Sequence, residues 1–190
     1  MKPTSRETYK AIRAMLEMKK FTQYRISKKN GITFSLVNRV VNWLVLQGYA
    51  VKRTGYYELV SPSAIFSLFP LSRRLKPYAI FDVALPAKEV LKLVKGNGTL
   101  CLASALSYYD DYYRDSAIHL YLKDGRILEE FKSLQKGYTH IELYNEDLNR
   151  DDFTVVNGQT ITTKVRTVID LFCANKAYAA ERLIKKEWAR

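Results

Sequence analysis

Apolar side chains recur every three or four positions in three successive segments near the start of the chain. This spacing predicts helices over residues 5–19 and 23–29, and a third helix from Thr33 or Ser35 to about residue 47. An Asn-Gly pair follows the second helix and a glycine follows the third, and both tolerate the left-handed backbone conformation that ends a helix. The start of the chain is therefore predicted to be three helices joined by short turns.

Two short runs of strand-forming residues follow the third helix. Residues 49–53 and 56–60 flank Thr54-Gly55, a pair typical of a tight hairpin turn, and two basic residues lie beside this turn. Three helices followed by a basic hairpin is the element order of a winged helix-turn-helix, in which the third helix enters the major groove of DNA. We expect such a domain over residues 1–60.

Segments with helical and strand-like patterns interleave from residue 77 to the end. This mixture predicts an α+β fold: a winged helix over residues 1–60, a connector over residues 61–76 and a mixed α/β domain over residues 77–190. Within that domain, strands are expected over residues 78–84, 118–122 and 139–144, and residues 153–161 are expected to form two strands on either side of a hairpin turn at Asn157-Gly158. Helices are expected over residues 87–95, 100–109, 127–134, 165–173 and 177–188.

The composition excludes several classes of protein. Apolar residues make up 47% and charged residues 26% of the 190, as in ordinary globular proteins. No apolar run approaches the roughly 18–20 residues of a membrane span, and the charged start is not followed by the apolar segment of a signal peptide. Cys101, Cys173, His119 and His140 provide neither a disulfide framework nor a zinc site. We therefore expect a cytoplasmic protein that needs no metal, no other cofactor and no membrane.

The charge is unevenly distributed along the chain. There are 31 Lys and Arg and 19 Asp and Glu, which gives a net charge of +12. Residues 1–60 carry twelve basic and three acidic residues, a net charge of +9. The net charge is +4 over residues 61–95 and −1 over residues 96–190. A polyanionic partner, either nucleic acid or an anionic membrane surface, is therefore expected at the first half of the chain.

One side of the third predicted helix is polar and free of carboxylates. Ser35, Asn38, Arg39 and Asn42 are spaced i, i+3, i+4 and i+7, so they form one stripe opposite the apolar side. Asparagine can pair with adenine, and arginine with guanine, at the edges of the bases. One alternative is a plain solvated face, but such faces usually mix Lys and Glu, and this stripe has no Glu. The other is a protein-docking winged helix, but the net charge of +9 over residues 1–60 favours double-stranded DNA. An operator with inverted repeats is the expected form of that DNA, and the oligomeric state stays open.

The candidate site extends from the third helix to the basic residues before it and to the hairpin. The candidate DNA contacts are Lys28, Lys29, Thr33, Ser35, Asn38, Arg39, Asn42, Lys52, Arg53 and Thr54. Arg73, Arg74 and Lys76 either extend this surface as additional phosphate contacts or belong to a solvated linker.

A catalytic site is not expected. Glu130-Phe131-Lys132 matches the Glu-x-Lys of metal-dependent nucleases, but it lies in a helical pattern, where the two charged side chains would point about 200° apart. Asp110, Asp111 and Asp115 cluster near several tyrosines without a metal-binding spacing. The sequence has no glycine-rich nucleotide-binding loop. A nuclease is therefore the least favoured hypothesis.

The order of segments after residue 98 resembles a known family. Residues 99–109, which contain the motif Ser-Ala-Leu, resemble a helix of the type IV antitoxins of abortive-infection systems, the AbiEi family. Residues 118–122 resemble that family's next strand. Residues 161–171 resemble its Thr-rich turn and the Arg-Thr-x-x-Asp-Leu helix that follows. Together with the winged helix, the resemblance covers nearly the whole chain.

The resemblance implies a transcriptional repressor that acts as the antitoxin of a type IV toxin-antitoxin system. It implies that the winged helix represses the protein's own operon, and that the C-terminal domain counteracts a nucleotidyltransferase-type toxin without forming a stable complex. It implies no catalytic residue, and we expect Arg166 and Asp170 of the motif to form an intrahelical pair or buried bridge. The alternative is a stand-alone winged-helix regulator whose C-terminal domain senses a ligand or a protein.

Overall fold

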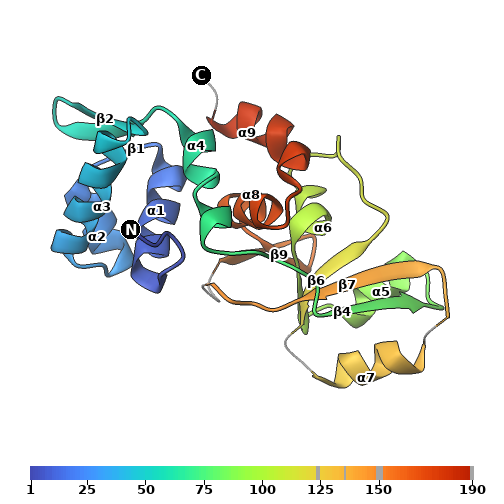
Figure 1. Ribbon diagram of the computed structural model, residues 1–190. Coiled ribbons are helices and arrows are strands. Elements are labelled where there is room, and N and C mark those ends of the chain that lie inside the picture. Colours follow the sequence, from blue (N-terminus) through green and yellow to red (C-terminus); the bar gives the residue numbers. More distant parts are fainter. Residues whose placement is uncertain (123–124, 135, 149–151, 189–190) are drawn as a thin grey trace. The chain divides into compact units, whose positions relative to one another are not determined.

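A computed structural model shows two compact units, each of which contains helices and strands (Figure 1). Unit 1 comprises Met1–Arg74 together with C-terminal residues from Ile184 onward, and unit 2 comprises Leu75–Leu183. The expected α+β fold is confirmed. The structure describes residues 1–122, 125–134, 136–148 and 152–188.

Unit 1 has the element order of a winged helix. Its first six elements are α1 (Arg6–Met18), β1 (Lys20–Phe21), α2 (Gln23–Asn30), α3 (Phe34–Leu46), β2 (Ala50–Arg53) and β3 (Tyr56–Leu59). The strands form an antiparallel sheet in the order β1-β3-β2. The three expected helices and the hairpin are confirmed. The sequence pattern missed β1, because a two-residue strand is too short to show a period.

The core of unit 1 is built from one side of each helix. Ile12 and Met15 of α1, Ile26 of α2, and Val40 and Leu44 of α3 are fully buried. The N-cap threonine of α2 accepts a backbone N–H through its hydroxyl, and a glycine with a φ of 62° ends the helix. These contacts fix which side of α3 faces solvent.

The segment expected to be a connector instead contributes to the core of unit 1. It forms α4 (Pro62–Phe66) and a 3-10 helix, η1 (Phe69–Leu71). Phe69 is fully buried, and its ring meets that of Tyr9 edge-on with the centroids 6.0 Å apart. The expected boundary at residue 60 therefore differs from the observed end of unit 1, because two prolines interrupt the helical period of these buried residues.

The end of the chain also belongs to unit 1. Trp188, at the end of α9 (Glu181–Trp188), donates an Nε1–H hydrogen bond to the backbone carbonyl of Leu16 (2.9 Å). Its ring meets that of Phe66 edge-on, with the centroids 5.2 Å apart. The expected domain over residues 77–190 therefore differs from unit 2 at its C-terminal end.

Unit 2 is built around a six-stranded mixed sheet. The strand order is β4-β7-β6-β5-β9-β8, in which the pairs β6/β7 and β5/β9 are parallel and the others are antiparallel. Its elements are β4 (Ala79–Val83), α5 (Ala87–Leu93), β5 (Gly98–Leu100), α6 (Leu102–Leu106), β6 (Ile118–Leu122), α7 (Gly125–Ser133), β7 (Thr139–Tyr144), β8 (Phe153–Val156), β9 (Gln159–Thr162), α8 (Lys164–Cys173), η2 (Ala177–Ala180) and the start of α9.

The helix expected over residues 100–109 is shorter than predicted, and a strand that the sequence pattern missed precedes it. Residues 98–100 form β5, which pairs with both β6 and β9 inside the sheet, and α6 covers only five residues. A three-residue strand does not show a two-residue period. Leu102 has a φ of 48°, which marks the sharp turn from the strand into α6. The other strands and helices expected in this unit occur within a few residues of the expected positions.

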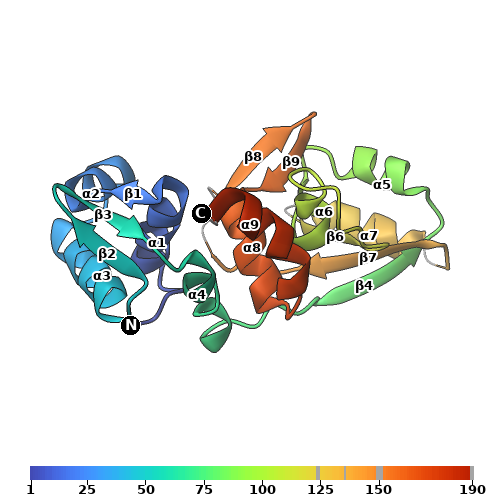
Figure 2. The same cartoon turned by 90° about the horizontal axis from the view of Figure 1, so that it is seen from above.

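Helices cover both faces of the sheet (Figure 2). One face is covered by α5 and α7, whose buried residues Val90, Ile127 and Phe131 pack in one core with every second residue of the strands, among them Leu120 of β6. On the other face, the neighbouring strand residue Tyr121 lies against α8. This alternation assigns the apolar positions of β6 to one layer and its polar positions to the other.

The buried polar layer contains an ion pair on α8. Arg166 Nε donates hydrogen bonds to the Asp170 carboxylate at 2.9 and 3.1 Å, and Tyr121 OH donates to the same carboxylate at 2.9 Å. Arg166 also donates to Tyr121 OH at 3.2 Å. Arg166 is 1% exposed and Asp170 is 0% exposed. The expected buried bridge is confirmed, and its charges compensate each other in the interior of the unit.

We expect Arg166→Ala to lower the free energy of unfolding by about 3–5 kcal/mol, because the substitution removes the charge that compensates the buried Asp170. Lys132→Ala is the matched control, since Lys132 pairs with Glu129 on the exposed side of α7, and its effect should stay within about 0.5 kcal/mol. Urea denaturation followed by circular dichroism measures both losses. Equal losses for the two variants would contradict a structural role for the buried pair.

Candidate functional site

The polar stripe of α3 is exposed along its whole length. Ser35, Asn38, Arg39 and Asn42 all lie on the solvent side of the helix. The opposite side is buried through Val37, Val40, Val41 and Leu44. The helix therefore presents short polar side chains and one guanidinium group to a partner, as base recognition in a major groove requires.

Three amide side chains are joined on this surface. Gln23 Nε2, at the start of α2, donates a hydrogen bond to Asn38 Oδ1 (2.9 Å), and Asn42 Nδ2 donates to the same oxygen (3.3 Å). Since the Asn38 carbonyl accepts both bonds, its own N–H groups remain to donate to base acceptors such as guanine N7 and O6. Gln23 was not among the expected contacts, and no feature of the sequence alone links it to the stripe.

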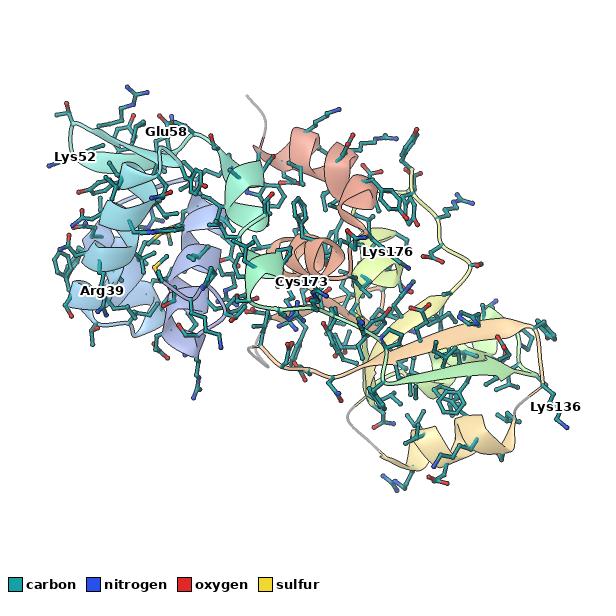
Figure 3. The ribbon with its side chains drawn as sticks, viewed as in Figure 1. Arg39, Lys52, Glu58, Lys136, Cys173 and Lys176 are labelled. Atoms are coloured by element: carbon teal, nitrogen blue, oxygen red, sulfur yellow. The ribbon has the colours of Figure 1, made fainter. Side chains whose placement is uncertain are left out.

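The charges around α3 are almost all positive. Residues 18–57, which span α2, α3 and the turn of the hairpin, contain eight Lys and Arg and no Asp or Glu. Arg39 forms no ion pair with any residue in the described part of the chain. Its guanidinium group is therefore not neutralised within the unit and is available to a phosphate or a guanine. Figure 3 shows Arg39 on α3 and Lys52 on the hairpin.

The hairpin places its basic residues in two different environments. Lys52 is exposed and has no ion-pair partner among the described residues. Arg53 Nε lies 3.4 Å from the carboxylate of Glu58, which is only 3% exposed and is also 3.3 Å from Lys20 Nζ. Glu58 thus neutralises part of the charge that Arg53 presents, which makes Lys52 the stronger candidate for a phosphate contact. Thr54 is exposed at the turn between β2 and β3.

The remaining expected contacts divide into exposed and buried side chains. Lys28 and Lys29 are exposed on α2, and Thr33 is exposed at the N-cap position of α3, where its hydroxyl caps no backbone N–H. Arg74 and Lys76 are exposed as well, but they belong to different units. Arg73 is only 6% exposed, which leaves its side chain little access to a phosphate.

The nuclease motif does not form a site. Glu130 and Lys132 lie on α7, and Lys132 pairs with Glu129 rather than Glu130, with Nζ 2.6 Å from the carboxylate. Among the residues that the structure describes, no group of three or more His, Cys, Asp and Glu side chains could hold a metal ion. Of the acidic cluster, Asp110 pairs with Arg182 at 3.2 Å. The helix thus separates the two charges that a shared metal site would need together.

A polar cluster surrounds His119 in unit 2. The fully buried imidazole has its Nε2 3.2 Å from Lys176 Nζ, 3.7 Å from the Asp115 carboxylate and 3.5 Å from the Glu142 carboxylate (Lys176 is labelled in Figure 3). Tyr144 OH donates to Glu142. The sequence pattern did not link His119 to Glu142 and Lys176, because these two residues lie far from it along the chain.

The cluster has shifted protonation equilibria. Burial, together with the Lys176 ammonium, lowers the pKa of His119 to about 4. Burial alone would raise the pKa of Asp115, but hydrogen bonds from the Ala117 backbone N–H and from Lys176 lower it overall. His119 is therefore neutral at pH 7 and closed to solvent, and the cluster joins the loop before β6 to the sheet rather than exposing a base to a substrate.

The pKa of His119 predicts a pH-dependent stability. In the unfolded chain His119 binds a proton below its ordinary pKa of 6.5, whereas in the folded chain it binds that proton only below about pH 4. The free energy of unfolding therefore falls as the pH falls through this window, by up to about 3 kcal/mol. Urea denaturation between pH 6.5 and 5 measures the slope. His119→Gln should flatten it, because the variant has no imidazole to titrate at this buried position. Identical slopes for the wild type and His119→Gln would contradict the burial of a neutral imidazole.

Comparisons with known proteins found no match to the chain. No family model matches the chain, and neither a curated protein nor a solved structure matches it. None of the described helices combines the length and the apolar character needed to cross a membrane.

Proposed function

We propose that the chain is a sequence-specific DNA-binding repressor that inserts α3 of unit 1 into the major groove. The observation that carries this proposal is the exposed stripe of α3, which combines Asn38, Arg39 and Asn42 with an environment free of carboxylates. The unpaired Lys52 of the hairpin supports a second contact, to the phosphate backbone beside the groove. Phosphate contacts would set the position on the duplex, and the stripe would select the sequence.

The wider proposal is that this repressor is the antitoxin of a type IV toxin-antitoxin system and acts in the cytoplasm on its own operon. It rests on the resemblance of residues 99–109, 118–122 and 161–171 to the AbiEi family. In this proposal unit 2 counteracts a nucleotidyltransferase-type toxin without binding it stably, and no residue of the chain is catalytic. The balanced charge of residues 96–190 supports a role for unit 2 other than DNA binding.

A second candidate function is a stand-alone regulator whose unit 2 binds a ligand. A pocket of about 870 Å³ in unit 2 favours it, since pockets of this size hold small molecules. Both candidates share the DNA-binding unit, and they differ in what unit 2 recognises.

We expect Arg39→Ala and Asn42→Ala each to weaken binding to the DNA upstream of the protein's own gene by about 1–3 kcal/mol, because each removes a base contact. Gel-shift titration measures the loss. Lys52→Gln should weaken binding to every sequence and reduce the salt slope by about 1. Lys88→Gln, the same loss of charge at an exposed site of unit 2, is the control. If Arg39→Ala and Asn42→Ala bind the upstream DNA as tightly as the wild type, α3 is not the recognition helix.

The antitoxin proposal predicts rescue of growth. If the neighbouring gene encodes the toxin, its expression alone should arrest growth, and co-expression with this chain should restore it. The variant carrying both Arg39→Ala and Asn42→Ala should still rescue when it is expressed from an independent promoter, because neutralisation is assigned to unit 2. A non-toxic neighbour, or a toxic one that the wild-type chain does not neutralise, would favour the stand-alone regulator.

A further inference from the structure

The pocket of unit 2 has an apolar floor. It opens between α5, the loop after α6 and the hairpin of β8 and β9, which Figure 2 shows together. Leu91, Leu100, Ile118 and Val156 line it from four different elements. These residues belong to, or pack against, the core on one face of the sheet. The floor is therefore a place where the apolar interior of unit 2 reaches a pocket wall, a surface that favours an apolar group.

The loop after α6, residues 107–117, forms the polar rim and is anchored at two points. Asp110 pairs with Arg182 at 3.2 Å, and Asp115 pairs with Lys176 at 3.0 Å. Each of these carboxylates also accepts a hydrogen bond from the backbone N–H two residues further along the loop. The rim is thus held in a defined position before any ligand binds.

Two other charged residues of the same loop do not anchor it through ion pairs. Asp111 and Arg114 line the pocket and are exposed. Neither forms an ion pair or side-chain hydrogen bond with any residue in the described part of the chain. Their charges are opposite, and the next carboxylate of the wall, Asp115, is already compensated by Lys176. The pocket therefore offers one uncompensated anion and one uncompensated cation above an apolar floor.

We propose that this pocket binds a small zwitterion with an apolar body, of the class of the apolar α-amino acids. The guanidinium group of Arg114 suits a carboxylate, which it can bind through two parallel N–H groups. The carboxylate of Asp111 suits the ammonium group of the same molecule, and the apolar side chain covers the floor. A simple anion would meet Asp111, and a simple cation would meet Arg114, so a ligand that carries both charges fits best.

Three probes of one shape separate the two charges. L-phenylalanine carries both groups, 3-phenylpropionate carries only the carboxylate, and phenethylamine carries only the ammonium. Isothermal titration calorimetry of the full chain should show that L-phenylalanine binds about tenfold or more tightly than either analogue, because each analogue leaves one charge of the rim without a partner. If no probe binds at millimolar concentration, or all three bind equally, the proposal is overturned.

Substitutions assign each charge to its residue. Arg114→Gln should weaken binding of L-phenylalanine and 3-phenylpropionate about tenfold and should not weaken binding of phenethylamine. Asp111→Asn should weaken binding of L-phenylalanine and phenethylamine about tenfold and should not weaken binding of 3-phenylpropionate. Both side chains are exposed and have no partner in the described part of the chain, so the variants should fold, which circular dichroism checks. Lys132→Gln, on exposed α7 outside the pocket, is the control. Unchanged binding in both rim variants would overturn the proposal, and neither result depends on DNA binding by unit 1.

Discussion

The burial of one side of α3 determines what unit 1 can present to a partner. Val37, Val40, Val41 and Leu44 lie in the core, and a rotation of the helix would expose them to water at a cost of about 1.5–3 kcal/mol for each large side chain. The polar stripe is therefore held outward by apolar packing rather than by its own contacts. The added layer of α4, η1 and Trp188 completes the core beside α1, so the presentation of the polar stripe depends on residues distant from it in sequence.

The distribution of carboxylates then determines where the charge of unit 1 is available. Glu7 pairs with Lys10 and Glu17 with Arg13 on α1, outside the stretch of α2 and α3 that has no acidic residue. Glu58 is the one carboxylate of the hairpin, and it is buried beneath the basic residues that flank it. This arrangement distinguishes Lys52, which is free to contact a phosphate, from Arg53, which is partly neutralised. A count of charges along the sequence treats the two residues as equal.

The sequence predicted elements with a clear period and missed those without one. The three helices, the hairpin at Thr54-Gly55 and most of the sheet of unit 2 follow from spacing and turn residues. The short strands β1 and β5 were missed because two or three residues carry no period. The expected connector folded into the core because the burial of Phe66 and Phe69 depends on α1 and on Trp188, which no local pattern reveals. Of the expected site, the stripe was predictable from helical spacing, whereas the hydrogen bond from Gln23 and the burial of Arg73 arise from tertiary packing.

In the proposed function, unit 1 contacts DNA through α3 and its hairpin, and unit 2 does not contact DNA. Mapping of backbone amide NMR shifts during titration with a duplex from the upstream region of the gene tests this claim most directly. We expect the shift changes to concentrate at residues 23–42 and 52–55, and the amide shifts of the sheet of unit 2 to remain unchanged. Shifts concentrated in unit 2, or none at low salt, where phosphate contacts are strongest, would contradict it.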